Sequence, residues 1–221
     1  MLTSYLPDEF FSKLAAIAKR QNFNPEDALS VMLMESGVNG KSIHPTAPAS
    51  GIFGLMFSTR EEAENFTKKS EVEQLDAYEK YMSTYKNVPK PTAANLYQLN
   101  FLPASAIPNQ KWYRGTDYDT VLAAKGGDGY GGKEDTYYNS NTVLDYNKDG
   151  AITVGDLANI LEARKQKAGT KWTELSQRIN GLLSSLPSKE KVKSTLSPIA
   201  KVSALSLLGV GGYLTYKRFK K

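Results

Sequence analysis

The chain has 221 residues, with 28 Lys and Arg, 23 Asp and Glu, one His and no Cys, which is enough for one domain and an additional segment. The lack of Cys excludes disulfides, a Cys nucleophile, iron–sulfur clusters and Cys-bound zinc, and a single His excludes the multi-His sites of catalytic zinc. We therefore expect carboxylate acid–base chemistry and metal ions with oxygen ligands.

The net charge of +5 is divided unevenly along the chain. Residues 157–221 contain 13 Lys and Arg against 3 Asp and Glu, which gives +10 and leaves −5 for residues 1–156. The most basic end, 217–221, directly follows an apolar run. This order predicts contact with a membrane surface and not with nucleic acid.

The patterns along the chain are mainly helical, and no strand pattern persists. We predict helices over 7–21, from an Asn24 cap to Gly37, and over 60–85, 92–102 and 157–167. Pro, Gly, Ser and Thr predict loops at 41–59 and 86–91, and glycines predict one at 126–132. The expected fold class is mainly α.

Glu35 lies on the last turn of the second predicted helix, where six of the seven preceding residues are apolar. Burial and the negative end of the helix dipole both disfavour an ionised carboxylate, so we expect a raised pKa. An acid that stays protonated near neutral pH can protonate a glycosidic oxygen. The alternative is a structural Glu that pairs with a Lys or faces solvent.

Several ordered motifs resemble those of lysozyme-like lytic transglycosylases, and most of all phage-encoded proteins that degrade peptidoglycan. They are MESGVN at 34–39, ASGIFGLMFST at 49–59, VEQLDAYEKY at 72–81 and LPASAI at 102–107. The family patterns are roughly E-S-G-x-N, A-S-G-L-I-Q-F-M-P-S-T and V-E-Q-L-D-Y-V-E-K-Y. The resemblance spans most of residues 1 to about 165.

This resemblance implies a lysozyme-like catalytic domain over 1–168, with Glu35 as the catalytic acid and base. It also implies that Ser50 and Tyr138 line the substrate cleft, although a surface loop is an equal reading for Tyr138. In this family the Glu protonates the glycosidic oxygen and then deprotonates the muramoyl 6-hydroxyl, which closes a 1,6-anhydro ring. No organic cofactor is needed.

Two positions depart from the family pattern: Gly54 stands where it has Gln, and Phe57 where it has Pro. A polar contact to the substrate is therefore missing. The acidic residues at 60–64 indicate the solvated start of a helix and not a second catalytic carboxylate. His44 lies in the loop after Glu35, and we do not assign it to the site.

Residues 145–156, DYNKDGAITVGD, fit the register of an EF-hand calcium loop. Position 6 is Gly150, which makes the sharp turn. The predicted Ca²⁺ ligands are Asp145, Asn147, Asp149, the Ala151 carbonyl and Asp156.

A loop that ends in Asp resembles those of dockerins and of the phage transglycosylases. The alternative is a metal-free turn. Because 137–144 is a poor helix, a complete helix–loop–helix is not expected.

The C-terminal part predicts attachment to a membrane. Residues 198–216 contain one charge, Lys201, and a helix of this length spans about 28 Å against about 30 Å of hydrocarbon. We predict a helical tether at 169–197, a transmembrane helix at 198–216 and a basic tail at 217–221. For 198–216 the alternative is a buried core helix or an amphipathic docking helix.

Together these features predict a membrane-anchored lytic transglycosylase of a phage virion, which opens peptidoglycan during genome delivery and binds structural Ca²⁺. Its expected partners are peptidoglycan, a lipid membrane and other virion proteins. Two alternatives remain open. One is a wall-binding virion protein that has lost catalysis, and the other is an endolysin that acts at lysis.

Overall fold

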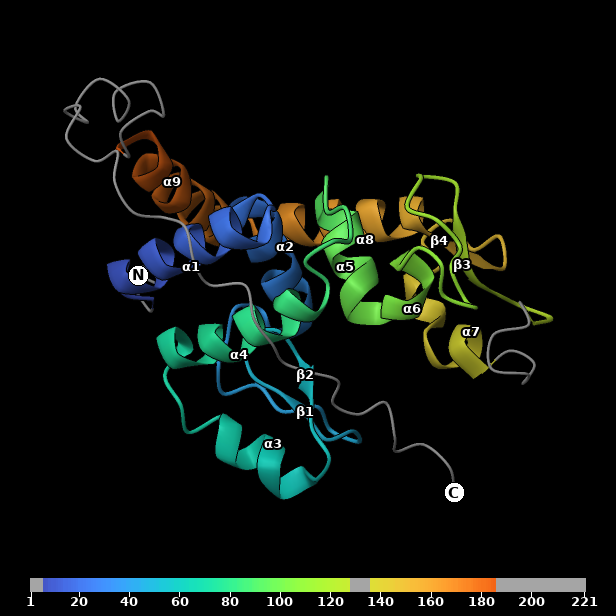
Figure 1. The fold of residues 1–221 in the computed structure, drawn as a ribbon, viewed down its shortest axis with the longest axis horizontal. Helices are drawn as coiled ribbons and strands as arrows, with labels where there is room; N and C mark the ends of the chain where they lie inside the picture. Colours follow the sequence, from blue (N-terminus) through green and yellow to red (C-terminus); the bar gives the residue numbers. More distant parts are fainter. Residues whose placement is uncertain (1–5, 128–135, 186–221) are drawn as a thin grey trace, which may run out of the picture. The chain divides into compact units, whose positions relative to one another are not determined.

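A computed structural model describes residues 6–127 and 136–185 of the chain, and it is mainly helical, as predicted (Figure 1). The elements follow in the order α1 (Asp8–Gln21), α2 (Pro25–Ser36), β1 (Ala49–Ser50), β2 (Leu55–Met56), α3 (Arg60–Phe66), α4 (Glu71–Thr84), α5 (Ala93–Phe101), α6 (Pro103–Ala106), β3 (Val121–Ala124), α7 (Thr136–Ser140), η2 (Thr142–Leu144), β4 (Ala151–Thr153), α8 (Val154–Ala168) and α9 (Thr170–Ser185).

The first two helices form where their capping residues predict them. Helix α1 buries one face against the core, including Phe10 and Leu14. Helix α2 begins at Asn24, whose side chain accepts a hydrogen bond from the Glu26 N–H at 3.0 Å, and it ends at Gly37 in the left-handed conformation. Because α2 is apolar on most sides, it lies inside the domain and packs against α5, α8 and α9.

The helix predicted over 60–85 is two helices in the structure. Helix α3 ends at Phe66, and α4 begins after Ser70, which forms a capping box with Glu73. The hydroxyl of Ser70 accepts from the Glu73 N–H, and the Glu73 carboxylate accepts from the Ser70 N–H. This reciprocal cap satisfies two backbone donors and starts a new helix where the apolar pattern alone appeared continuous.

Two short antiparallel strand pairs were not predicted. Strand β1 pairs with β2 to form a hairpin over 49–56, and β3 pairs with β4 with Ala123 opposite Ile152. Each strand has only two to four residues, which is too short to leave an alternating apolar pattern in the sequence.

Helix α9 belongs to the compact unit, which extends to Ser185. Its Leu175 and Ile179 are buried in the same core as α1 and α2, and the Arg178 guanidinium lies 4.2 Å from the centre of the Phe11 ring. Residues 170–185, which we expected in a tether, therefore pack on the domain. The rest of the predicted tether, the transmembrane segment 198–216 and the tail 217–221 lie outside the described residues.

A helix that crosses a membrane needs about 20 consecutive, mainly apolar residues. Within 6–127 and 136–185, no helix is both long and apolar enough to cross a membrane.

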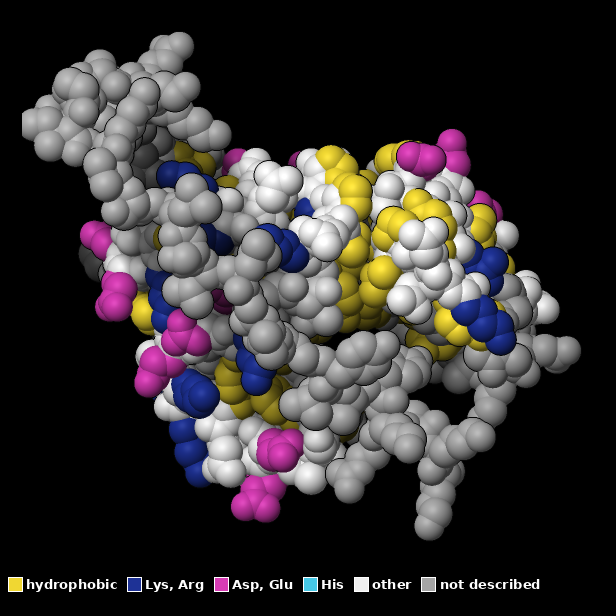
Figure 2. All heavy atoms as spheres, viewed as in Figure 1, with side chains coloured by type: hydrophobic (Ala, Val, Ile, Leu, Met, Phe, Trp, Pro, Cys, Tyr) yellow, Lys and Arg dark blue, Asp and Glu magenta, His cyan; other side chains and the backbone are white. Residues whose placement is uncertain are grey.

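Large hydrophobic side chains reach the surface mainly in the second half of the domain. Tyr118, Val143 and Tyr146 are 57%, 76% and 51% exposed, and all three lie close in sequence to β3 or β4. Figure 2 shows hydrophobic side chains on this face around α6 and β3, and acidic side chains both near β3 and around α1, α3 and α4.

One buried side chain, Gln74 of α4, joins three segments of the chain. Its amide oxygen accepts from the Ile52 N–H at 2.9 Å, and its amide nitrogen donates to the Gly40 carbonyl at 2.8 Å and to the Lys69 carbonyl at 3.1 Å. Gln74 is fully buried. It therefore fixes the loop after α2 and the turn of the β1–β2 hairpin to α4.

We expect Gln74→Leu to lower the free energy of unfolding by about 3 kcal/mol, because it leaves a buried N–H and two carbonyls without partners. Urea unfolding would measure the change. The control is Gln166→Leu at an exposed position of α8. Equal stability of the two variants would show that these buried bonds contribute little.

Candidate functional site

Glu35 lies on the last turn of α2, as predicted, with its carboxyl enclosed by two other segments. The side chains of Asn100 and Tyr97, both on α5, hydrogen bond to the carboxyl. Gly54 at the end of the hairpin turn lies on another side, since a Cβ atom built there would be 2.6 Å from Glu35 Oε2. The residue as a whole keeps some exposed surface, while its carboxyl is largely buried.

Burial raises the pKa of the Glu35 carboxyl to about 7, and the hydrogen bonds from Asn100 and Tyr97 oppose this rise. The direction confirms the expectation from the sequence. No second carboxylate is among the groups that act on this pKa in the described part of the chain. A carboxyl with this pKa is present in both protonation states near neutral pH, so it can donate and accept a proton in turn.

The hairpin reaches Glu35 through a turn that depends on glycine. Gly51 and Gly54 have φ angles of +81° and +62°, a left-handed region that other residues adopt at a cost. Phe53, between them, stacks on Tyr78 of α4 with ring centroids 3.4 Å apart. The Phe53 carbonyl accepts from Asn100 Nδ2 at 3.2 Å. Asn100 therefore connects the hairpin to the carboxyl of Glu35.

Asn100 and Tyr97 are candidate site residues that could not be assigned from the sequence. They lie three residues apart and so share one face of α5. Burial and the Glu35 carboxylate both raise the pKa of the Tyr97 hydroxyl, so Tyr97 stays protonated and acts as a donor. The sequence feature that could have indicated them is a Tyr and an Asn three residues apart in the largely apolar helix α5.

The structure places the two predicted cleft residues away from the Glu35 carboxyl contacts. Ser50 is 2% exposed, and its hydroxyl donates to the Ala63 carbonyl at 2.7 Å, which joins β1 to α3. Tyr138 donates to Asp145 Oδ2 at 2.6 Å, so it lies at the predicted calcium loop. These contacts give both side chains structural roles, and their contact with a substrate stays a prediction.

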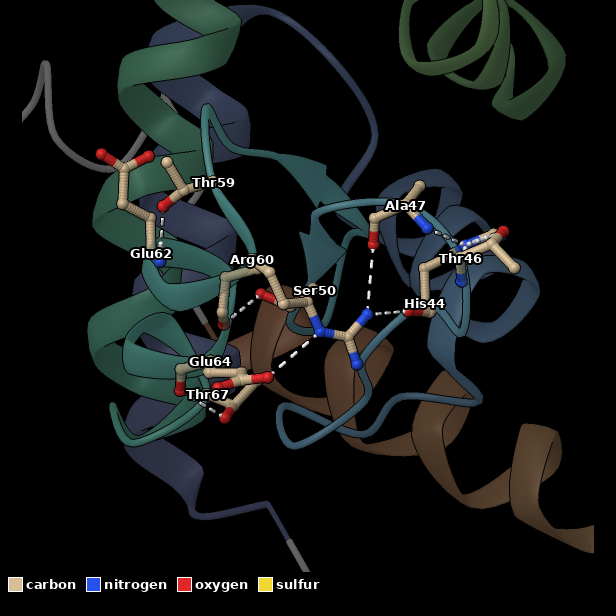
Figure 3. A network of polar contacts seen from close by, with 10 residues as sticks. His44, Thr46, Ala47, Ser50, Thr59, Arg60, Glu62, Glu64 and Thr67 are labelled. Atoms are coloured by element: carbon tan, nitrogen blue, oxygen red, sulfur yellow. Dashed lines mark hydrogen bonds and ion pairs between the residues drawn. The ribbon is translucent and has the colours of Figure 1, made fainter.

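His44 orders the loop that leads into the hairpin. Its Nδ1 accepts from the Ala47 N–H at 3.0 Å and from the Thr46 N–H at 3.3 Å. Figure 3 shows Arg60 of α3 reaching across to the carbonyls of His44 and Ala47 while it pairs with Glu64. His44 is exposed and bound within its own loop, so its position agrees with its omission from the candidate site.

The acidic residues that open α3 are a solvated helix start, as predicted. Glu61, Glu62 and Glu64 are all exposed. Glu62 Oε2 accepts from the Ser58 N–H at 3.0 Å, and Glu64 pairs with Arg60 at 3.1 Å. Carboxylates at this end of the helix complement its dipole.

The predicted calcium loop has its first carboxylate at its centre. Asp145 is 6% exposed, and its carboxylate accepts from the Gly150 N–H at 3.0 Å and from the Asp149 N–H at 3.2 Å. The hydrogen bond from Tyr138 and these backbone donors lower the pKa of Asp145, which keeps it ionised. Lys148 and Gly150, with φ angles of 61° and 91°, fold the loop back on this group.

The last predicted ligand, Asp156, has a partner inside the loop. Helix α8 starts at Val154, before the predicted residue 157, and Asp156 forms its capping box with Thr153. Asp156 Oδ2 accepts from the Thr153 N–H at 2.9 Å and from its hydroxyl at 2.6 Å. Within the described ranges, no three His, Cys, Asp or Glu side chains converge as a metal site.

The segment that enters this loop is a poor helix, as predicted. It consists of the short helix α7 and the turn η2. Strand β4 within the loop pairs with β3. The loop is therefore supported by a sheet contact to β3 as well as by its continuation into α8.

The raised pKa of Glu35, from 4.5 to about 7, predicts a stability that depends on pH. Below about pH 4 the carboxyl is protonated in both the folded and unfolded states. As the pH rises, the unfolded state loses the proton first, so Glu35 destabilises the fold increasingly until its folded pKa is passed. We expect Glu35→Gln to stabilise the protein by up to about 3 kcal/mol near pH 8 and by almost nothing near pH 4.

Chemical denaturation of wild type and Glu35→Gln at both pH values would measure this difference. Glu61→Gln, at an exposed position of α3, is the control for the loss of one negative charge. A gain for Glu35→Gln that is the same at both pH values would contradict the raised pKa.

No protein-family model, curated protein or solved structure matches the chain. The function of the protein is therefore inferred from the surroundings of Glu35 and from the sequence motifs around it.

Proposed function

We propose that the protein is a peptidoglycan lytic transglycosylase with a lysozyme-like domain. The observation that carries this proposal is the partly buried Glu35 carboxyl, held by Asn100 and Tyr97 and raised in pKa to about 7. The motifs at 34–39 and 49–59 provide the substrate class through their resemblance to this enzyme family. The mainly helical fold is compatible with such a domain.

The proposed reaction uses one carboxyl group twice. Protonated Glu35 donates its proton to the oxygen of the β-1,4 bond between MurNAc and GlcNAc, and the bond from this oxygen to the anomeric carbon breaks. The Glu35 carboxylate then accepts the proton of the muramoyl 6-hydroxyl, whose oxygen bonds to the anomeric carbon. The products are a free 4-hydroxyl and a 1,6-anhydro ring, and Glu35 is protonated again.

The hydrogen-bond partners of the Glu35 carboxyl are consistent with a reaction that uses a single carboxyl group. Retaining and inverting glycosidases require a second acidic group within about 5 to 10 Å. The groups around Glu35 that act on its pKa in the described residues are an amide and a phenol. A substrate that supplies its own hydroxyl nucleophile needs no second acid.

We expect the full-length protein to release 1,6-anhydro-muropeptides from purified sacculi and Glu35→Gln to release about 1,000-fold less, since the proton donor is lost. Mass spectrometry of the soluble products measures both. Glu62→Gln, which removes an exposed carboxylate beside the hairpin, should retain activity.

The same measurement separates the alternatives. Products with reducing ends would indicate hydrolysis. Sacculi that bind the wild-type protein but stay intact would contradict the enzymatic proposal and favour a wall-binding virion protein.

We also propose that residues 145–156 bind one structural Ca²⁺ ion. The ligands would be Asp145, Asn147, Asp149, the Ala151 carbonyl and Asp156. The low pKa of Asp145 and the loop bent around it support a cation at this place. The Asp156 carboxylate would have to serve both the ion and the Thr153 cap. An ion there would join β4 to the start of α8, at a position that takes no part in proton transfer.

Titration calorimetry should detect one Ca²⁺ per wild-type chain, and Ca²⁺ should raise the melting temperature because it binds the folded state. Asp149→Ala should remove the heat of binding and the shift in melting temperature together. The control, Asp119→Ala, removes an exposed carboxylate from another loop. No heat with the wild-type protein would refute the site.

For its location, we propose a phage virion protein that the segment 198–216 anchors in a membrane. The support is the sequence alone: 19 residues with one charge, followed by a basic tail. Detection of the protein in purified virions would separate action during genome delivery from action as an endolysin at lysis.

A further inference from the structure

Helix α9 contacts both ends of α2, the helix that carries Glu35. At the beginning of α2, Ser176 and Asn180 donate hydrogen bonds to the carboxylate of Glu26. At its end, the Lys171 ammonium donates to the carbonyl of Gly37. The order of these contacts shows that the two helices run antiparallel, and Figure 1 shows α9 alongside α1 and α2.

A second cation reaches the same end of α2 from helix α8. Arg164 Nε donates to the Leu33 carbonyl at 3.2 Å, and this carbonyl also accepts from the Gly37 N–H at 3.2 Å. Leu33 and Gly37 lie two residues before and two residues after Glu35. Two positive side chains therefore bind the negative end of the α2 dipole. Their acceptors, the carbonyls of Leu33 and Gly37, come before and after Glu35 in the sequence.

The turn that these cations bind has a costly backbone conformation. Gly37 and Val38 are consecutive residues with φ angles of 66° and 62°, and a left-handed conformation is a genuine outlier for a β-branched residue such as Val. Such a conformation persists only where its surroundings enforce it. Val38 is 2% exposed, and the Ser36 hydroxyl beside it donates to the Ile52 carbonyl of the hairpin at 2.9 Å.

We propose that Arg164 and Lys171 are positioning residues, which hold the strained turn at 35–39 and thereby keep the Glu35 carboxyl against Asn100 and Tyr97. Neither side chain contacts the carboxyl itself. Arg164 acts through the Leu33 carbonyl of α2, and Lys171 acts through the carbonyl of Gly37, which caps this helix. The catalytic consequence rests on the proposed transglycosylase function, whereas the effect on the turn itself can be measured without it.

In the full-length chain, Arg164→Met and Lys171→Met should each lower kcat on soluble peptidoglycan strands about 10-fold, because a displacement near 1 Å can cost up to about 100-fold. KM should change little, since no substrate contact is removed. Lys171→Arg retains a donor and a charge, so it should restore kcat. Lys167→Met removes an equal charge from an exposed position of α8 and should behave as wild type.

Hydrogen exchange of the amides at 35–39 gives a readout that does not depend on activity. It should be faster in Arg164→Met and Lys171→Met than in Lys167→Met, with the amides of α4 unchanged as evidence that the fold is intact. Unchanged exchange at 35–39 would overturn the proposal, and so would a kcat equal to that of Lys167→Met. A wild-type protein without glycan cleavage would instead refute the proposed function, while the exchange rates would still decide whether the cations hold the turn.

Discussion

The burial of the Glu35 carboxyl is the constraint on which the rest of the site depends. It requires that α2 be apolar on most sides, that the hairpin at 49–56 cover the end of this helix, and that α5 supply donors where water has been removed. A carboxyl in such a place destabilises the folded state at neutral pH. The contacts of α2 with α5, α8 and α9 must offset this cost. At Glu35, the burial that suits the proposed proton transfer therefore lowers the stability of the folded state.

Gly54 shows how the backbone adapts to that carboxyl. Its φ of +62° and its closeness to Glu35 Oε2 both disfavour a side chain, which explains glycine at a position where the transglycosylase pattern that the sequence resembles has Gln. Phe57, in place of Pro, packs on Phe66 with ring centroids 4.9 Å apart and joins the hairpin to α3. Gly54 and Phe57, the two residues that differ from the pattern, therefore both have structural reasons in this hairpin. Because position 54 has no side chain, the hairpin presents backbone atoms to Glu35 there.

The features that could be predicted from the sequence are those with a local cause. The Asn24 cap, Gly37 and the apolar run before Glu35 are sufficient to predict α2 and the raised pKa, because capping and burial act within a few residues. Asn100 and Tyr97 could not be assigned, since their contact with Glu35 joins residues about 60 positions apart. The amphipathic pattern of α9 suited a tether and a docked helix equally. Only the core residues around Leu175 and Ile179 decide between the two.

Helix α8 links the two parts of the molecule for which we propose a function. Its first turn is fixed by Asp156, the last residue of the candidate calcium loop, and its Arg164 binds the end of α2 beside Glu35. An α-helix is stiff over this distance, because about two turns separate the two residues. The cap at Asp156 and the contact of Arg164 with α2 therefore lie on one stiff element, which also packs against α5 and α9. Helix α8 is thus the element that connects the 145–156 loop to the end of α2 on which Glu35 lies.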